Sequence, residues 1–151
     1  MLGWLGRRVD LLAIGVGSGI ASLGSLALVA VARHTWEPSP DAGPTAATLE
    51  DAFHEWLAAG TGVCIGCAVA TAISRRWPIR GGLISGALAC FLVLIPALIL
   101  TLPDDVTSDE KPGFVLFGAI ALGPFVLVGT LLGAIWRVVL PNRRNGAPVE
   151  S

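Results

Sequence analysis

The chain contains four long stretches without a single Asp, Glu, Lys, Arg or His residue. They cover residues 11–32, 56–74, 81–102 and 113–136. An α-helix rises about 1.5 Å per residue and the hydrocarbon layer of a bilayer is about 30 Å thick, so a crossing helix needs about 20 apolar residues. Because all four stretches reach or approach that length, the sequence predicts an all-α fold, a polytopic membrane bundle of four helices. Only 14% of the residues are charged, whereas a soluble domain has about 25%.

Short polar segments divide this single membrane domain, which covers residues 1–151. The expected segments are membrane helices at about 11–32, 49–74, 81–102 and 113–139, outer loops at 33–48 and 103–112, and a cytoplasmic tail at 140–151. Thr48 precedes Leu49-Glu50-Asp51, a capping-box pattern that predicts the start of the second helix. Residues 75–80 form a connection so short that the second and third helices should pack as an antiparallel hairpin. The tail, with Pro141 near its start, is expected to lack regular structure.

The charges alternate in sign from loop to loop and therefore predict the topology. Residues 1–10, 75–80 and 137–151, which lie outside the uncharged stretches, hold eight arginines against two acidic residues. Residues 33–55 and 103–112 hold nine acidic residues against two basic ones. By the positive-inside rule the arginine-rich segments stay in the cytoplasm, so we expect both termini there. Nine arginines to one lysine suggest a GC-rich bacterial genome, and hence a bacterial plasma (inner) membrane.

The first apolar stretch also fits a cleaved secretory signal. Arg7-Arg8 would form its basic start and Ala30-Val31-Ala32 an A-x-A cleavage site. The apolar region of a signal peptide is usually about 7–15 residues long, whereas this stretch has 22. We therefore favour a retained first membrane helix.

Each predicted membrane helix carries one pair of glycines four residues apart. The pairs are Gly15/Gly19, Gly62/Gly66, Gly82/Gly86 and Gly129/Gly133. Helices in lipid associate through close backbone approach, which small residues on one face allow, so we expect these pairs at helix contacts. Ser18, Ser22 and Ser85 extend the same faces and join the predicted packing set.

The glycine pairs also suggest an internal repeat. Gly15 and Gly82, and likewise Gly62 and Gly129, are 67 residues apart, so one offset superposes all four pairs. A duplicated helical hairpin would give a parallel repeat, with both copies oriented alike and related by an axis along the membrane normal. The overall identity between the two halves is low, and chance placement stays open beside duplication.

Two groups of residues invite a metal or thiol interpretation. They are the cysteines Cys64, Cys67 and Cys90, and the histidines His34 and His54. The cysteines fall deep within predicted membrane helices, where a low dielectric disfavours the reactive thiolate. The histidines fall at the outer ends of adjoining helices, and zinc prefers three or four converging ligands. We predict neither a metal site nor a cofactor, and expect lipid contact instead.

No phosphate-binding loop, hydrolase elbow or metalloprotease motif occurs in the chain, so no enzymatic activity is predicted. The favoured hypothesis is a non-enzymatic membrane protein that acts through helix–helix association, as a homo-oligomer or as an accessory subunit of a membrane complex. Its partners would be lipids and itself or another membrane protein, not nucleic acid. Two alternatives stay open: a small oligomeric channel or carrier for uncharged solutes, lined by Ser18, Ser22, Ser85 and Thr130, and a membrane thiol or metal-binding protein.

Overall fold

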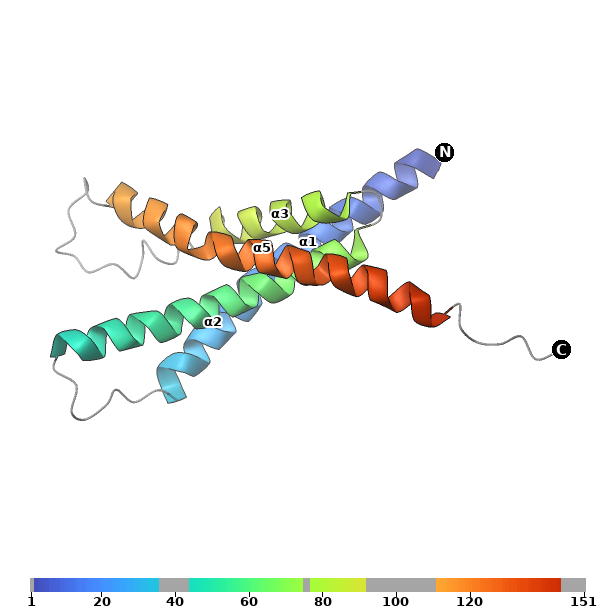
Figure 1. Cartoon of the computed structure of the whole chain (residues 1–151). Coiled ribbons are helices and arrows are strands. Elements are labelled where there is room, and N and C mark those ends of the chain that lie inside the picture. The colour runs from blue at the N-terminus through green and yellow to red at the C-terminus, as the bar shows by residue number, and fades with distance from the viewer. Residues whose placement is uncertain (1, 36–43, 75–76, 92–110, 145–151) are drawn as a thin grey trace.

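The computed structural model describes residues 2–35, 44–74, 77–91 and 111–144 of the chain. The described residues form four helices, and none of them is a strand (Figure 1). The helices are α1 (Leu2–Thr35), α2 (Pro44–Ile73), α3 (Pro78–Ala89) and α5 (Lys111–Arg144). The predicted all-α class is therefore confirmed.

Three of these helices are long and apolar enough to cross a membrane, at Asp10–Thr35, Phe53–Ile73 and Ile120–Val139. Their mean hydropathies are 1.9, 1.8 and 1.8. These segments are typical of a membrane protein and agree with the first, second and fourth predicted membrane helices. The third predicted membrane helix, 81–102, begins in α3, and its second half lies outside the described residues.

Two helix ends differ from the expected ones. The helix α2 begins at Pro44, so Thr48 lies one turn inside it and does not cap its start. Proline suits the first turn of a helix, because its ring holds a helical φ and no N–H is needed there. The helix α5 continues through Pro141 to Arg144, beyond the predicted start of an irregular tail. A proline so near the end removes one backbone hydrogen bond and leaves only one turn beyond it.

The helix α2 lies at the centre of the arrangement and contacts α1, α3 and α5 (Figure 1). It runs antiparallel to α1 and ends at Ile73, and α3 begins only five residues later at Pro78. The backbone N–H of Gly81 donates to the carbonyl of Trp77 at 2.8 Å and closes the first turn of α3. The predicted contact between the second and third helices is therefore confirmed.

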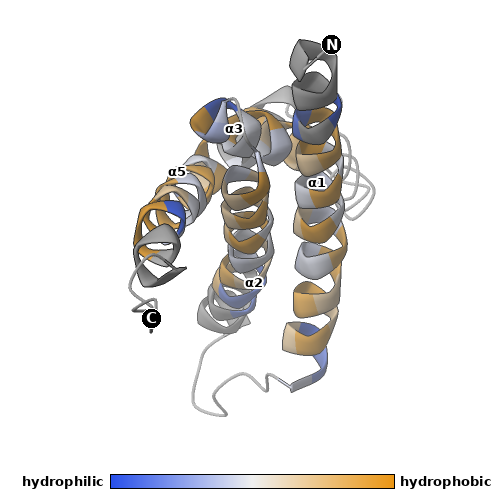
Figure 2. Ribbon diagram, turned by 90° about the vertical axis from the view of Figure 1, so that its right-hand side faces the viewer, coloured by the Kyte–Doolittle hydropathy of each residue, from blue (hydrophilic) through white to orange (hydrophobic). Residues whose placement is uncertain are grey.

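Small residues fill the interior of the molecule, and large apolar residues cover its surface. Ala21 and Ala70 are 0% exposed, whereas Leu23 and Ile120 are 71% and 66% exposed. Hydrophobic residues lie along α1, and hydrophilic ones gather near its ends (Figure 2). A water-soluble protein buries its large apolar side chains, but in a bilayer lipid tails solvate them. The placement of small side chains inside and large apolar side chains outside therefore supports the membrane assignment, independently of helix length.

Candidate functional site

The most closely packed part of the molecule is the contact between α1 and α2. On α1, small buried residues recur every four positions. They are Ala13, Gly17, Ala21 and Ser25. On α2, a matching stripe consists of Gly62, Gly66 and Ala70 and continues to Ser74, the residue that follows the helix; all four are buried. Residues four apart lie on one face of a helix, so each stripe presents a flat surface on which the other backbone can rest.

The two stripes meet so closely that no side chain fits at their glycines. A Cβ at Gly66 would lie 2.5 Å from that of Ala21, and one at Gly17 would lie 2.5 Å from that of Ala70. A Cβ at Gly62 would overlap the backbone nitrogen of Ser25. Real Cβ atoms essentially never approach another atom within 3.0 Å. These three positions therefore require glycine for the present spacing of the helices.

A polar contact ties the same two helices together within the apolar layer. The Ser25 hydroxyl donates to the Ala59 carbonyl of α2 at 2.7 Å. The Ser25 side chain is fully buried. Such a bond satisfies a hydroxyl that has no water partner, and interhelical serine bonds of this kind contribute about 0.6–2 kcal/mol in membrane proteins.

The helix α5 packs against another side of α2 in the same manner. A Cβ at Gly129 would overlap the backbone of Cys64, and one at Gly133 would overlap the carbonyl oxygen of Ala68. A Cβ at Gly60 would lie 2.5 Å from the Phe125 ring, so this contact continues one turn further. The three contacts keep one register, because α2 and α5 run in the same direction. They place Gly129 and Gly133 at a helix contact.

The helix α3 packs against α1, α2 and α5 through its own glycine pair and Ser85. A Cβ at Gly82 would overlap the Thr71 hydroxyl, and one at Gly86 would lie 2.7 Å from the Cys67 sulfur. The Ser85 hydroxyl lies 2.6 Å from the place that a Cβ on Gly17 would occupy. It is fully buried and has no hydrogen-bond partner among the described residues.

The predicted glycine pair of α1 is the exception. Gly15 and Gly19 have nothing within 4 Å of the place where a Cβ would stand, whereas Gly17 between them is buried against α2 and α3. Two residues along a helix correspond to a rotation of about 200°, so the helix turns the Gly15/Gly19 side away from its neighbours. The pair therefore makes no close helix contact within the described part of the chain, and its role in helix packing stays a prediction. The longer run of small residues that begins at Ala13 was the signal that identifies the buried face.

The glycine pairs superposed by the 67-residue offset do not occupy equivalent places. Gly15 and Gly19 are open, whereas Gly82 and Gly86 of α3 lie against other helices. The described contacts therefore do not reproduce the symmetry that a duplicated hairpin would impose. The internal repeat stays a prediction.

The ends of α1 are joined to α2 by charged side chains that the sequence pattern does not pair. At one end, Arg33 makes two hydrogen bonds to the Glu55 carboxylate, Nε to Oε1 at 2.6 Å and Nη2 to Oε2 at 3.0 Å. At the other end, the Ser74 hydroxyl donates to Asp10 Oδ1 at 2.8 Å, and Arg137 Nη1 of α5 donates to the Ser74 carbonyl. Ser74 is 1% exposed and so lies at the junction of α1, α2 and α5.

Two of the three cysteines lie in the apolar interior, and Cys64 is partly buried. Cys67 and Cys90 form a buried cluster with Val63 and Leu122, and Phe125 packs against it. All three cysteines are free thiols. Their surroundings are those of packing residues, which behave as small hydrophobes.

The histidines do not complete a metal site in the described part of the chain. His34 is exposed at the end of α1, and the ring of His54 makes an edge contact with Phe53 at a centroid distance of 6.1 Å. No group of three or more His, Cys, Asp or Glu side chains that would hold a metal ion occurs among the described residues.

Three of the four hydroxyl groups considered as a channel lining are buried, and that of Ser18 is partly exposed. The Ser18 hydroxyl donates to the Gly15 carbonyl of its own helix at 3.1 Å, and that of Thr130 donates to the Val126 carbonyl at 2.7 Å. Ser22, Ser85 and Thr130 are buried between helices. Their positions are those of side chains in closely packed helix contacts.

Comparison with known proteins found no matching family model, no matching curated protein and no matching solved structure.

Proposed function

We propose that this protein is a non-enzymatic membrane module that acts through helix–helix association in the plane of the bilayer. It serves as a homo-oligomer or as an accessory subunit of a larger membrane complex. One observation carries the proposal: the glycine pairs of α2, α3 and α5 lie against neighbouring helices, whereas Gly15 and Gly19 of α1 face open space. Gly19 of this pair is available for a helix from outside the chain.

The physical basis is the weakness of other forces between helices in lipid. Because lipid tails are as apolar as leucine, helices associate where small residues let their backbones approach and gain dispersion contact. Gly19 lies near the middle of the membrane segment Asp10–Thr35, and Leu23, one turn further, is 71% exposed. A partner helix that crosses α1 at Gly19 would gain the glycine contact and cover Leu23.

The proposed setting is the plasma membrane of a bacterium, with both termini in the cytoplasm. The arginine-rich N-terminal segment, 75–80 connection and C-terminal tail support this orientation. The opposite side would then carry most of the acidic residues.

Native mass spectrometry of the full chain in mild detergent tests the association. The expected species is a homo-oligomer or a complex with one foreign membrane subunit at fixed stoichiometry. Gly19→Leu should weaken that species about tenfold or more, because the added side chain keeps the backbones apart. Gly123→Leu is the matched control, since Gly123 on α5 also has open space around it and lies on a different helix.

Two results would contradict the proposal. One is a wild-type chain that stays monomeric at every protein concentration. The other is an assembly that Gly19→Leu leaves unchanged while the variant retains its helical content.

A further inference from the structure

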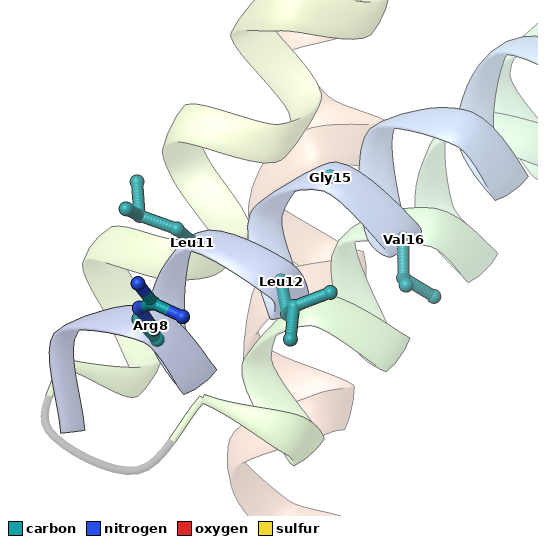
Figure 3. A pocket seen from close by; sticks show the side chains of 5 residues that line it. All are labelled: Arg8, Leu11, Leu12, Gly15 and Val16. Atoms are coloured by element: carbon teal, nitrogen blue, oxygen red, sulfur yellow. The ribbon is translucent and has the colours of Figure 1, made fainter. Parts of the chain in front are cut away.

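A shallow groove runs along the open side of α1 near its N-terminal end. Its lining residues are Arg8, Leu11, Leu12, Gly15 and Val16 (Figure 3). Leu11 projects on one side of the helix, and Leu12 and Val16 on the other, so Gly15 forms the floor between them (Figure 3). The floor is empty because Gly15 has no side chain and nothing lies within 4 Å of the place of its Cβ.

The groove has a charged end and an apolar end. Arg8 is exposed and precedes the membrane segment that begins at Asp10. Leu11, Leu12 and Val16 follow within that segment and are 69%, 65% and 45% exposed. The eight helical steps from Arg8 to Val16 span about 12 Å along the helix axis, which is most of the roughly 15 Å thickness of one hydrocarbon leaflet. The groove therefore leads from the membrane surface into one leaflet.

We propose that this groove binds an anionic phospholipid, whose phosphate contacts Arg8 and whose acyl chain lies over Gly15. The guanidinium group has five N–H donors, and its planar fork matches a phosphate. Arg8 also interacts within the chain, and the number of its donors allows a phosphate as a second partner. A net negative headgroup adds attraction to basic side chains at the membrane surface.

Charge complementarity distinguishes this occupant from a second copy of the chain. A parallel second copy seated in the groove would bring its own Arg8 next to this one, and like charges would repel. An acyl chain with an anionic head places an apolar tail against Leu11, Leu12 and Val16 and a negative group against Arg8. One molecule thus matches both ends of the groove.

The lipid site does not depend on the proposed association. A partner helix that crosses α1 at Gly19 with the roughly 40° angle common for glycine pairs diverges from α1 toward Arg8. The groove then remains open to lipid. Separate variants test the two ideas, Gly15→Leu for the lipid and Gly19→Leu for the partner helix.

The test is lipid retention by the full chain, reconstituted in vesicles of phosphatidylglycerol and phosphatidylcholine and then released into mild detergent. Native mass spectrometry should show one phosphatidylglycerol retained per chain, about tenfold in preference to phosphatidylcholine. Gly15→Leu should remove the retained lipid, because leucine fills the floor of the groove. Arg8→Gln should abolish the preference for the anionic headgroup.

Two matched controls keep the result specific. Gly123→Leu adds the same side chain at another open glycine, and Arg80→Gln removes another exposed arginine, one that stacks on Trp77 at 5.2 Å. Both variants should retain phosphatidylglycerol as the wild type does. The proposal is overturned if the wild type retains no lipid, or if Arg8→Gln and Arg80→Gln lower retention equally. It is also overturned if the chain forms a dimer from which lipid is absent.

Discussion

Gly66 shows how a single residue sets the distance between α1 and α2. The place of its Cβ is taken by the Gly17 carbonyl and the Ala21 side chain, which belong to the neighbouring helix. Gly66 adopts no positive φ, since the described residues contain none. The requirement for glycine therefore comes from the closeness of α1 and not from backbone conformation.

Replacing Gly66 by alanine should destabilise the fold by about 1–3 kcal/mol, the usual range for overpacking a closely packed interior. The same change at Gly19 should be neutral or stabilising by up to about 1 kcal/mol, because alanine favours a helix and the site is open. Denaturation of both variants in detergent, followed by circular dichroism, measures the difference. Equal stability of the two variants would contradict the packing observed at Gly66.

At the scale of the helices, the apolar stretches predicted where α1, α2 and α5 lie, because their length and lack of charge are properties of a single segment. The buried face of α1 is different. Two sets of small residues, one containing Gly15 and one containing Gly17, compete on that helix. Only the neighbouring helices decide between them, and the set that contains Gly17 is the one that lies against α2 and α3.

The charged contacts at the two ends of α1 also could not be predicted from the sequence. Asp10 and Ser74 are 64 residues apart, and Arg33 and Glu55 are 22 apart. Neither spacing has a pattern that pairs the residues before the helices are placed. The register of the small-residue stripes brings each pair together. These contacts therefore result from the helix packing and cannot be used to predict it.

The contacts at the two ends of α1 should contribute differently to the free energy of unfolding. Ser74→Ala should cost about 1–3 kcal/mol, because it removes the hydroxyl that binds Asp10 at a buried junction. Glu55→Gln should cost only about 0.2–1 kcal/mol, and less at high salt, because the Arg33–Glu55 pair is solvent-accessible. Unfolding of the two variants at low and high ionic strength provides the comparison. A larger and salt-sensitive loss for Glu55→Gln would reverse the expected order.

At the scale of the whole molecule, the exposed large side chains and the buried small ones require a solvent of lipid tails around the helices. The orientation within that solvent is set by charges outside the helices. Arginine crosses a membrane at high cost, so segments rich in arginine stay on the side where the chain was made. The segments at 1–10, 75–80 and 140–151 carry this signal together, and the proposed orientation, with both termini in the cytoplasm, agrees with all three.

Cysteine labelling in intact cells measures that orientation. In a chain whose Cys64, Cys67 and Cys90 are replaced by alanine, a single cysteine is introduced at Ser108 or at Ser151. A membrane-impermeant maleimide should label Ser108→Cys, and should label Ser151→Cys only after the cells are opened. The controls are the cysteine-free chain, which should stay unlabelled, and Ser74→Cys, which the buried position should protect in both conditions. Labelling of Ser151→Cys in intact cells would mean that the arginines do not determine which side retains the C-terminus.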